Sequence, residues 1–210
     1  MKVKAVIFDL DGTLLDTKEF VFQAYEHSLS LHRLEATKRE IMAPLIGQRI
    51  EAIYQIIAPT GDNKLLIESH FAFQAKNFHL VKSFPNILEV IIKLKKLGIK
   101  IGIVTTRLQN TKQTLKIGGL EPKLFDVIIT GDEVIKAKPD PEGIFLALKK
   151  LKVKPAEALM VGDGAADIEM AKNAKVKTVG VTWGFGGRNI KNSKPDYLID
   201  KIEELLTLLK

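Results

Sequence analysis

Residues 3–16, VKAVIFDLDGTLLD, join an apolar, β-branched run to two closely spaced aspartates. Residues 3–8 have the length of a strand and lack regular polar alternation, which is typical of a parallel strand covered on both faces. Asp9 and Asp11 follow directly, and residues two apart in extended chain project to the same side. Gly12 permits a tight turn after them. Because ligands bind open parallel sheets at the carboxyl ends of strands, we expect both carboxylates to serve one site.

Downstream of this run the chain divides into a helical stretch and a stretch of alternating elements. Residues 16–83 carry apolar positions at helical spacing, and Thr17 is the expected N-cap of the first helix. The helices expected there span residues 18–31, 41–46, 50–57 and 65–78. From residue 84 onward the expected strands span residues 100–105, 126–130, 158–162, 177–181 and 197–199. They alternate with expected helices at residues 85–97, 108–117, 141–151, 165–174 and 202–209.

This order of elements predicts an α/β fold with one insertion. Strands that alternate with helices form right-handed βαβ units and a doubly wound parallel sheet. Residues 1–15 and 84–210 are therefore expected to form the α/β core, and residues 16–83 an inserted helical cap. Because the insertion leaves the first strand just after Asp9 and Asp11, we expect the cap to lie over both carboxylates.

The composition of the 210 residues, 46% hydrophobic and 27% charged, is that of an ordinary globular protein. The chain has no cysteine, which excludes disulfides, thiolate metal sites and a cysteine nucleophile, and fits a cytoplasmic location. It has no apolar run long enough to span a membrane and no signal-peptide layout, so no membrane partner is expected. The net charge of +7 is dispersed along the predicted helices, which favours a small anionic partner over nucleic acid. The sequence carries no signal for the oligomeric state.

Three later groups of polar residues also follow predicted strands. Thr105 and Thr106 form a hydroxyl pair at the end of one strand. Lys138 lies in the loop AKPDP, which two prolines stiffen, and Asp163 and Asp167 follow another strand. Taken alone, each group is compatible with helix capping or with an ordinary loop. Their agreement with the first motif indicates one site at the carboxyl edge of the sheet.

In their order along the chain, these motifs resemble those of the haloacid dehalogenase superfamily of phosphotransferases. The first motif, DLDGT at residues 9–13, is highly specific, and the later ones are matched by Thr105, by Lys138 and by Gly162-Asp163 with Asp167. The resemblance covers the whole chain and implies a Rossmann-like α/β core with a small α-helical cap. It is strongest to the phosphoglycolate phosphatase branch. Pyrophosphatases of that branch look similar around residues 104–106 and 130–132, and the sequence does not separate the two.

The resemblance implies a Mg²⁺-dependent phosphatase of a small phosphorylated metabolite. In this reading Asp9 is the nucleophile that forms an aspartyl-phosphate, and Asp11 is the general acid toward the leaving group and then the general base toward water. The metal is held by the carboxylates of Asp9 and Asp163 and by the backbone carbonyl of Asp11, with Asp167 as a nearby support. A hard cation with oxygen ligands offsets the like charges that the reaction brings together.

The phosphate-binding groups implied by the resemblance are the Thr105 hydroxyl, the backbone N–H groups of Leu10 and Thr106, and Lys138. These donors supply the neutralisation of phosphoryl oxygens that phosphoryl transfer needs. In the expected cap, Arg49 is a candidate for reaching an anionic substrate, with a solvated helix residue as the alternative. The loop WGFGG at residues 183–187 either borders the pocket or buttresses it, and we favour the buttress.

Several alternatives stay open for the function. The pair Thr106-Arg107 departs from the Asn-Lys pair usual in the phosphoglycolate branch, which weakens transfer of the substrate but not of the reaction. A pyrophosphatase or a phosphosugar mutase of the same superfamily is therefore an alternative to a phosphoglycolate-like phosphomonoester hydrolase. A signalling receiver domain belongs to a different class, and the insertion and the pair Asp163 and Asp167 argue against it. A dehalogenase is disfavoured because Asp11 is present.

Overall fold

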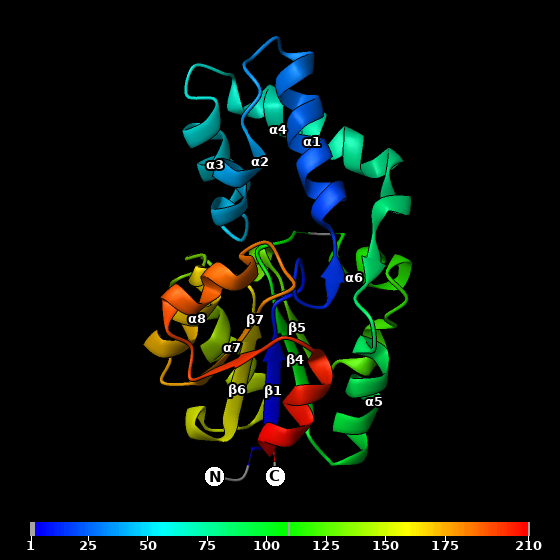
Figure 1. Ribbon diagram of the computed structural model, residues 1–210, viewed down its shortest axis with the longest axis vertical. Helices are drawn as coiled ribbons and strands as arrows, with labels where there is room; N and C mark the ends of the chain where they lie inside the picture. Colours follow the sequence, from blue (N-terminus) through cyan, green and yellow to red (C-terminus); the bar gives the residue numbers. More distant parts are fainter. Residues whose placement is uncertain (1–2, 109, 210) are drawn as a thin grey trace.

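The computed structural model of the protein describes residues 3–108 and 110–209. Figure 1 shows a sheet flanked by helices, and a separate group of helices beyond the ends of the strands. None of the helices in the described ranges combines the length and the hydropathy that crossing a membrane requires.

Six parallel strands form the main sheet, in the order β5-β4-β1-β6-β7-β8. They are β1 (Ala5–Phe8), β4 (Lys100–Val104), β5 (Val127–Ile129), β6 (Ala158–Gly162), β7 (Lys177–Val181) and β8 (Tyr197–Ile199). β1 lies inside the sheet, and its pairing places Phe8 beside Ile103 of β4 and Val161 of β6. The residues that follow these three strands therefore meet at one edge, as expected for parallel strands.

Helices cover both faces of this sheet, which confirms the predicted doubly wound α/β fold (Figure 1). They are α5 (Ile87–Lys96), α6 (Thr111–Ile117), α7 (Glu142–Leu151) and α8 (Ala165–Asn173). Ile7 packs in the apolar cluster that contains α7 and α8, whereas Phe8 packs in the cluster that contains α5. Successive side chains of β1 thus enter opposite cores, which explains why its sequence shows no polar alternation.

The inserted segment forms helices α1 (Lys18–Leu31), α2 (Arg39–Met42), α3 (Ile50–Ile57) and α4 (Asn63–Lys76). These lie beyond the carboxyl ends of the strands, on the side where the sequence placed them (Figure 1). α1 and α4 pack together, and the Ser28 hydroxyl donates a hydrogen bond to the Leu66 carbonyl at 2.8 Å.

A small antiparallel ribbon joins this segment to the sheet and was not predicted. Its strands are β2 (Leu15–Asp16) and β3 (Lys82–Ser83), with Leu15 opposite Ser83. Two-residue strands leave no periodic signal in a sequence. The ribbon lies at both junctions between the predicted core, residues 1–15 and 84–210, and the predicted cap, residues 16–83. This division into two domains stays a prediction.

The local differences from the expected elements have identifiable causes. Thr17 stands at the N-cap position of α1, but its side chain makes no capping bond because its ψ of 15° departs from the extended N-cap conformation. In place of the expected helix over residues 41–46, the α-helix Arg39–Met42 is followed by the 3₁₀ helix Ala43–Leu45, because Pro44 cannot donate the backbone hydrogen bond that would continue an α-helix. Residues 202–209 form a 3₁₀ rather than an α-helix. The 3₁₀ helices are Ala43–Leu45, Phe78–Leu80, Pro122–Leu124, Gly131–Glu133, Pro155–Glu157, Gly187–Ser193 and Ile202–Leu209.

The core of the cap contains a buried histidine, His70 of α4, which is 3% exposed. The side-chain amide of Gln74 donates to its Nε2 at 3.0 Å, so Nδ1 carries the hydrogen that faces the Tyr54 hydroxyl oxygen at 3.1 Å. The Tyr25 ring packs against the imidazole edge to face, with centroids 4.5 Å apart. Burial, with the positive charge of Arg107 as a second cause, lowers the pKa of His70 to about 3. The imidazole is therefore neutral in the folded protein at neutral pH.

This neutral histidine makes the fold sensitive to acid. The pKa of histidine in an unfolded chain is about 6.5, so between that pH and about pH 3 the unfolded state binds more protons than the folded state. Stability therefore falls as the pH falls through this window. From about pH 7 to about pH 5 the His70 contribution to the free energy of unfolding drops by about 2 kcal/mol.

We predict that His70→Gln loses about 2 kcal/mol less stability than the wild type over that pH change. Urea unfolding at each pH measures this difference. His79→Gln, at an exposed histidine, is the matched control and keeps the wild-type pH dependence. If the free energy of unfolding fell by the same amount in His70→Gln and in the wild type over this pH change, another group would cause the acid sensitivity.

Candidate active site

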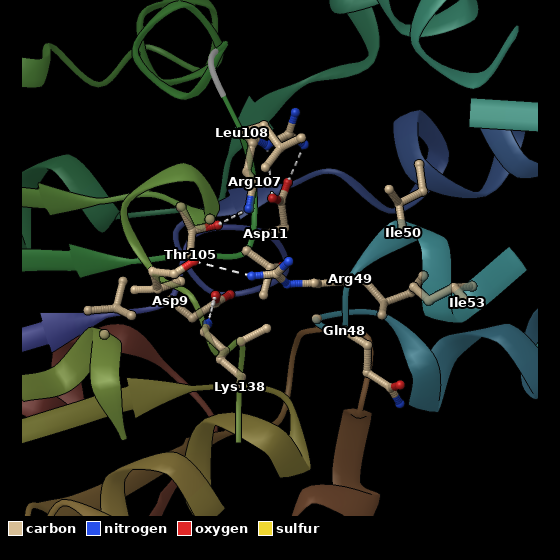
Figure 2. A pocket seen from close by; sticks show the side chains of 18 of the residues that line it. Asp9, Asp11, Gln48, Arg49, Ile50, Ile53, Thr105, Arg107, Leu108 and Lys138 are labelled. Carbon is tan, nitrogen blue, oxygen red and sulfur yellow. Dashed lines mark hydrogen bonds and ion pairs between the residues drawn. The ribbon is translucent and has the colours of Figure 1, made fainter. Parts of the chain in front are cut away.

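A cavity of about 460 Å³ lies between the cap and the carboxyl edge of the sheet. Its core side is lined by the residues that follow β1 and β4 and by the loop that carries Lys138. Its cap side is lined by residues of α1, α3 and α4 and by the turn before α3. Figure 2 shows Asp9, Asp11, Thr105 and Lys138 on one side of this space and residues of the cap on the other. The expectation that the cap covers both aspartates is confirmed.

Three buried carboxylates gather beside this cavity. Asp9 follows β1, and Asp163 and Asp167 follow β6, and each of the three offers an oxygen within 4.8 Å of the others. The Lys138 ammonium donates to Asp9 Oδ1 at 2.5 Å and to Asp167 Oδ1 at 2.6 Å. In ionised form this group carries three negative charges against one positive charge, in a place that water hardly reaches.

The pKa values of the group reflect this imbalance. Burial is the largest cause that raises the pKa of Asp9, and it outweighs the lowering by Lys138. Burial, followed by repulsion from Asp167, raises the pKa of Asp163 to about 7. Burial acts in the opposite sense on Lys138, but attraction to Asp167 and Asp9 raises its pKa above the usual range. The positive charge near the carboxylates is therefore too small to compensate them all, while the Lys138 ammonium stays protonated.

Such a set of donors fits a hard divalent cation. Carboxylate oxygens are the ligands that Mg²⁺ and Ca²⁺ prefer, and a doubly charged ion would offset the excess negative charge. The side-chain group consists of Asp9, Asp163 and Asp167, three of the four residues expected at the metal. The fourth, Asp11, was expected to contribute its backbone carbonyl, and this contribution stays a prediction.

The loop after β7 holds Asp163 in place. The Phe185 N–H donates to Asp163 Oδ2 at 2.7 Å, and the Thr13 hydroxyl donates to Oδ1 at 3.0 Å. A Cβ atom on Gly184 would lie 2.2 Å from Asp163 Oδ2, so only glycine allows this approach. Trp183 in turn donates its indole N–H to the Thr13 carbonyl at 3.1 Å. Residues 183–187 thus act as a buttress, the favoured of the two interpretations.

Asp11 does not join the three carboxylates but pairs with Arg107. The guanidinium binds it in a fork, from Nε to Oδ2 at 3.0 Å and from Nη2 to Oδ1 at 2.7 Å (Figure 2). Burial raises the pKa of Asp11, but the charge and hydrogen bonds of Arg107 outweigh it, so the pKa lies below its usual value. The pair favours the carboxylate form, which is the form that takes a proton from water.

The threonine pair after β4 is set against the neighbouring loop. Thr105 Oγ1 accepts the Arg107 backbone N–H at 3.1 Å, which leaves its hydroxyl hydrogen free to bond an acceptor in the cavity. A Cβ atom on Gly131 would lie 2.5 Å from the Thr106 carbonyl oxygen, so the β5 loop packs directly on this turn. Both threonines line the cavity, and their predicted contacts with a phosphoryl group stay predictions.

Arg49 reaches from the cap to the core, although not to a carboxylate. Its Nη2 donates to the backbone carbonyls of Val134 at 3.2 Å and Ile135 at 2.7 Å, in the segment before Lys138. Figure 2 shows its side chain extending from the cap into the space beside Asp9. Its predicted contact with an anionic substrate stays a prediction, since in this structure it bridges the cap and the core.

Sequence reasoning missed two kinds of site residue. Thr13 was quoted within the first motif but given no role, although a hydroxyl in that specific motif was a usable signal. Arg107 was noted only as a departure from a related branch. Its fork on Asp11 joins residues 96 positions apart, and nothing in either local sequence indicates that pairing.

Comparisons with known proteins confirm the resemblance. The model of the haloacid dehalogenase-like hydrolase family matches residues 6–181. Two relatives named pyrophosphatase PpaX, from Bacillus cereus strain Q1 and Bacillus mycoides strain KBAB4, are 37% and 38% identical over 211 residues. Both alignments cover 100% of this chain, and they cover 97% and 98% of the relatives.

Solved structures give the same result for the fold. A predicted phosphoglycolate phosphatase from Haemophilus somnus 129pt superposes with a TM-score of 0.91 at 24% identity, covering 100% of this chain and 99% of that one. A protein from Bacteroides fragilis described as a haloacid dehalogenase-like hydrolase has a TM-score of 0.87 at 30% identity, with coverage of 97% and 100%. On the family match and the full-length relatives, the chain belongs to the haloacid dehalogenase-like hydrolase family.

Proposed function

We propose that this protein is a Mg²⁺-dependent phosphohydrolase that cleaves inorganic pyrophosphate through an aspartyl-phosphate on Asp9. The observation that carries the reaction is the buried group of Asp9, Asp163 and Asp167 with Lys138, placed beside a cavity between two parts of the chain. The family assignment supports a hydrolase, and the geometry supports Asp9 as the residue that attacks phosphorus.

The metal site follows from the donors present. Asp9, Asp163 and Asp167 would hold the ion, and their excess negative charge is the observation that supports a divalent cation over a monovalent one. When bound, Mg²⁺ supplies positive charge that offsets the phosphoryl oxygens and the attacking carboxylate. The contacts of Asp163 with Thr13 and Phe185 fix one ligand in advance.

The reaction then proceeds in two displacements. A carboxylate oxygen of Asp9 bonds to phosphorus while the bond to the leaving oxygen breaks, and that oxygen departs with the electron pair as part of the released phosphate. Because the pair with Arg107 favours the carboxylate form of Asp11, its role as general acid in this step stays a prediction. Water next attacks the same phosphorus and gives a proton to Asp11, while the bond to Asp9 breaks and restores its carboxylate. Covalent catalysis of this kind replaces one difficult step by two easier ones. Proton transfer by Asp11 contributes roughly 10²–10⁴ in rate.

The choice of pyrophosphate depends on the relatives and on the charge of the cavity. The relatives at 37–38% identity over the full chain are named pyrophosphatases, whereas the phosphoglycolate phosphatase likeness at 24% identity concerns the fold. Arg49, Arg107 and Lys138 all line the cavity, which suits a substrate that is anionic at both ends. A phosphoglycolate-like phosphomonoester is the second candidate, since it too carries two anionic groups. A cytoplasmic location fits either metabolite.

We predict that Asp9→Asn lowers kcat for pyrophosphate at least about a thousandfold, because the amide is a far weaker nucleophile. Phosphate release with saturating Mg²⁺ measures the effect, and circular dichroism checks the fold. Glu169→Gln, which removes an exposed charge from the same helix as Asp167, is the matched control and keeps wild-type activity. Turnover by Asp9→Asn near the wild-type rate would reject the nucleophile assignment. Wild-type activity confined to phosphomonoesters would reject the substrate.

A second prediction concerns the buttress of Asp163. Gly184→Ala forces a methyl group against the Asp163 carboxylate and displaces this ligand. We expect the Mg²⁺ concentration for half-maximal activity to rise by about tenfold to a hundredfold, the usual cost of disturbing a ligand's support. Thr182→Ala, in the same loop but bonded to Asp200, is the control and leaves the Mg²⁺ requirement unchanged. An unchanged requirement in Gly184→Ala would show that Asp163 does not bind the metal.

A further inference from the structure

Arg107 is a strong cation at the wall of the cavity that takes no part in the two displacements of the proposed reaction. Its side chain is only 8% exposed, and its fork on Asp11 occupies Nε and Nη2. Its backbone is fixed on both sides, because its N–H donates to Thr105 Oγ1 and its carbonyl accepts from the Gly131 N–H at 2.9 Å. The guanidinium is therefore preorganised at the wall of the cavity.

The outer edge of this guanidinium remains available to a ligand. A guanidinium has five N–H donors, and the fork leaves both hydrogens of Nη1 unused. Within residues 3–108 and 110–209 no protein acceptor contacts Nη1. The ring of Phe20, from cap helix α1, lies 5.4 Å from the guanidinium carbon and covers one face. The cap thus shields one face of the group, and Arg107 is among the residues that line the cavity.

Of the other basic groups that line the cavity, Lys138 and Arg49 are already occupied, and Lys136 has a side chain that is 72% exposed and pairs with Asp140 at 3.7 Å. Lys138 is held between Asp9 and Asp167, and Arg49 donates to two backbone carbonyls. An uncharged leaving group would leave the free Arg107 donors without an acceptor in a poorly solvated place, which is costly. A phosphate oxygen supplies that acceptor, and the planar fork of arginine can serve a carboxylate on one edge and a phosphate on another.

We infer that Arg107 is a specificity-determining residue that binds the departing phosphate of a diphosphate through Nη1. At the same time, its Nε and Nη2 keep Asp11 beside the oxygen that bridges the two phosphorus atoms. The inference rests on the proposed function, and it names the part of the substrate that the phosphoryl-binding groups Thr105 and Lys138 leave unbound. A lysine at this position would bind the Asp11 carboxylate and the departing phosphate less well than arginine, because its ammonium is a point charge without a planar fork of donors.

The test compares two unreactive ligands that differ by one phosphoryl group. Methylenediphosphonate carries both groups of the substrate, and methylphosphonate carries only the one that Asp9 would attack. Their dissociation constants are measured by phosphorus NMR titration of the Mg²⁺-loaded protein, a readout that needs no turnover. The variants are Arg107→Gln and Arg107→Lys, and Arg188→Gln, at an arginine whose side chain is 81% exposed, is the matched control.

For Arg107→Gln we expect the dissociation constant of methylenediphosphonate to rise by about tenfold to a hundredfold, the usual loss of a charge-assisted contact. That of methylphosphonate should change less than about threefold. Arg107→Lys should lie between Arg107→Gln and the wild type for the diphosphonate, and Arg188→Gln should match the wild type for both ligands. The conservative variant keeps the experiment informative if Arg107→Gln folds poorly.

Equal weakening of both ligands, or of neither, would overturn the role of Arg107. Equal weakening would mean that the residue only supports the local structure around Asp11. Absence of pyrophosphate cleavage by the wild type is a separate outcome, and it would overturn the proposed substrate instead. The two failures are distinguishable because ligand binding and turnover are measured independently.

Discussion

Lys138 Nζ lies between Asp9 and Asp167, with Asp163 close by, so that one ammonium faces three buried carboxylates. Charges removed from water are costly unless they are compensated, and here the compensation is incomplete. The raised pKa values of Asp9 and Asp163 express that deficit of positive charge. A divalent cation would offset this deficit, and only then could the site accept an anionic phosphoryl group.

The fold supplies the constraints that keep these charges together. β1 lies inside a parallel sheet, so Asp9 emerges from a strand that cannot shift without disturbing two apolar cores. The loop after β7 locks Asp163 through Phe185 and through the close approach of Gly184. The cap covers the cavity and is joined to the core by the two-stranded ribbon, by Arg49 and by apolar packing. A cap over the cavity suits a site that must admit a substrate and exclude water from it.

Much of this was predictable from the sequence, for reasons that differ between elements. The strands at residues 158–162 and 177–181 were predicted with the bounds observed, because buried parallel strands are largely apolar runs. The short strand at residues 197–199, predicted at the edge of the sheet, also has its predicted bounds. The gathering of Asp9, Thr105, Lys138 and Asp163 followed from strand order and a specific first motif. The Arg107 fork on Asp11 and the ribbon β2–β3 depend on tertiary approach over long separations, which no local pattern encodes.

The central claim is that Asp9 becomes phosphorylated, and it can be observed directly. Wild-type protein is mixed with pyrophosphate and Mg²⁺, quenched within one turnover and treated with borohydride, which reduces an acyl phosphate to an alcohol. Mass spectrometry of the peptide that contains residues 3–16 then locates the reduced side chain. The account predicts substrate-dependent reduction at Asp9 alone. Reduction at another carboxylate, or turnover with no reduced residue, would contradict it.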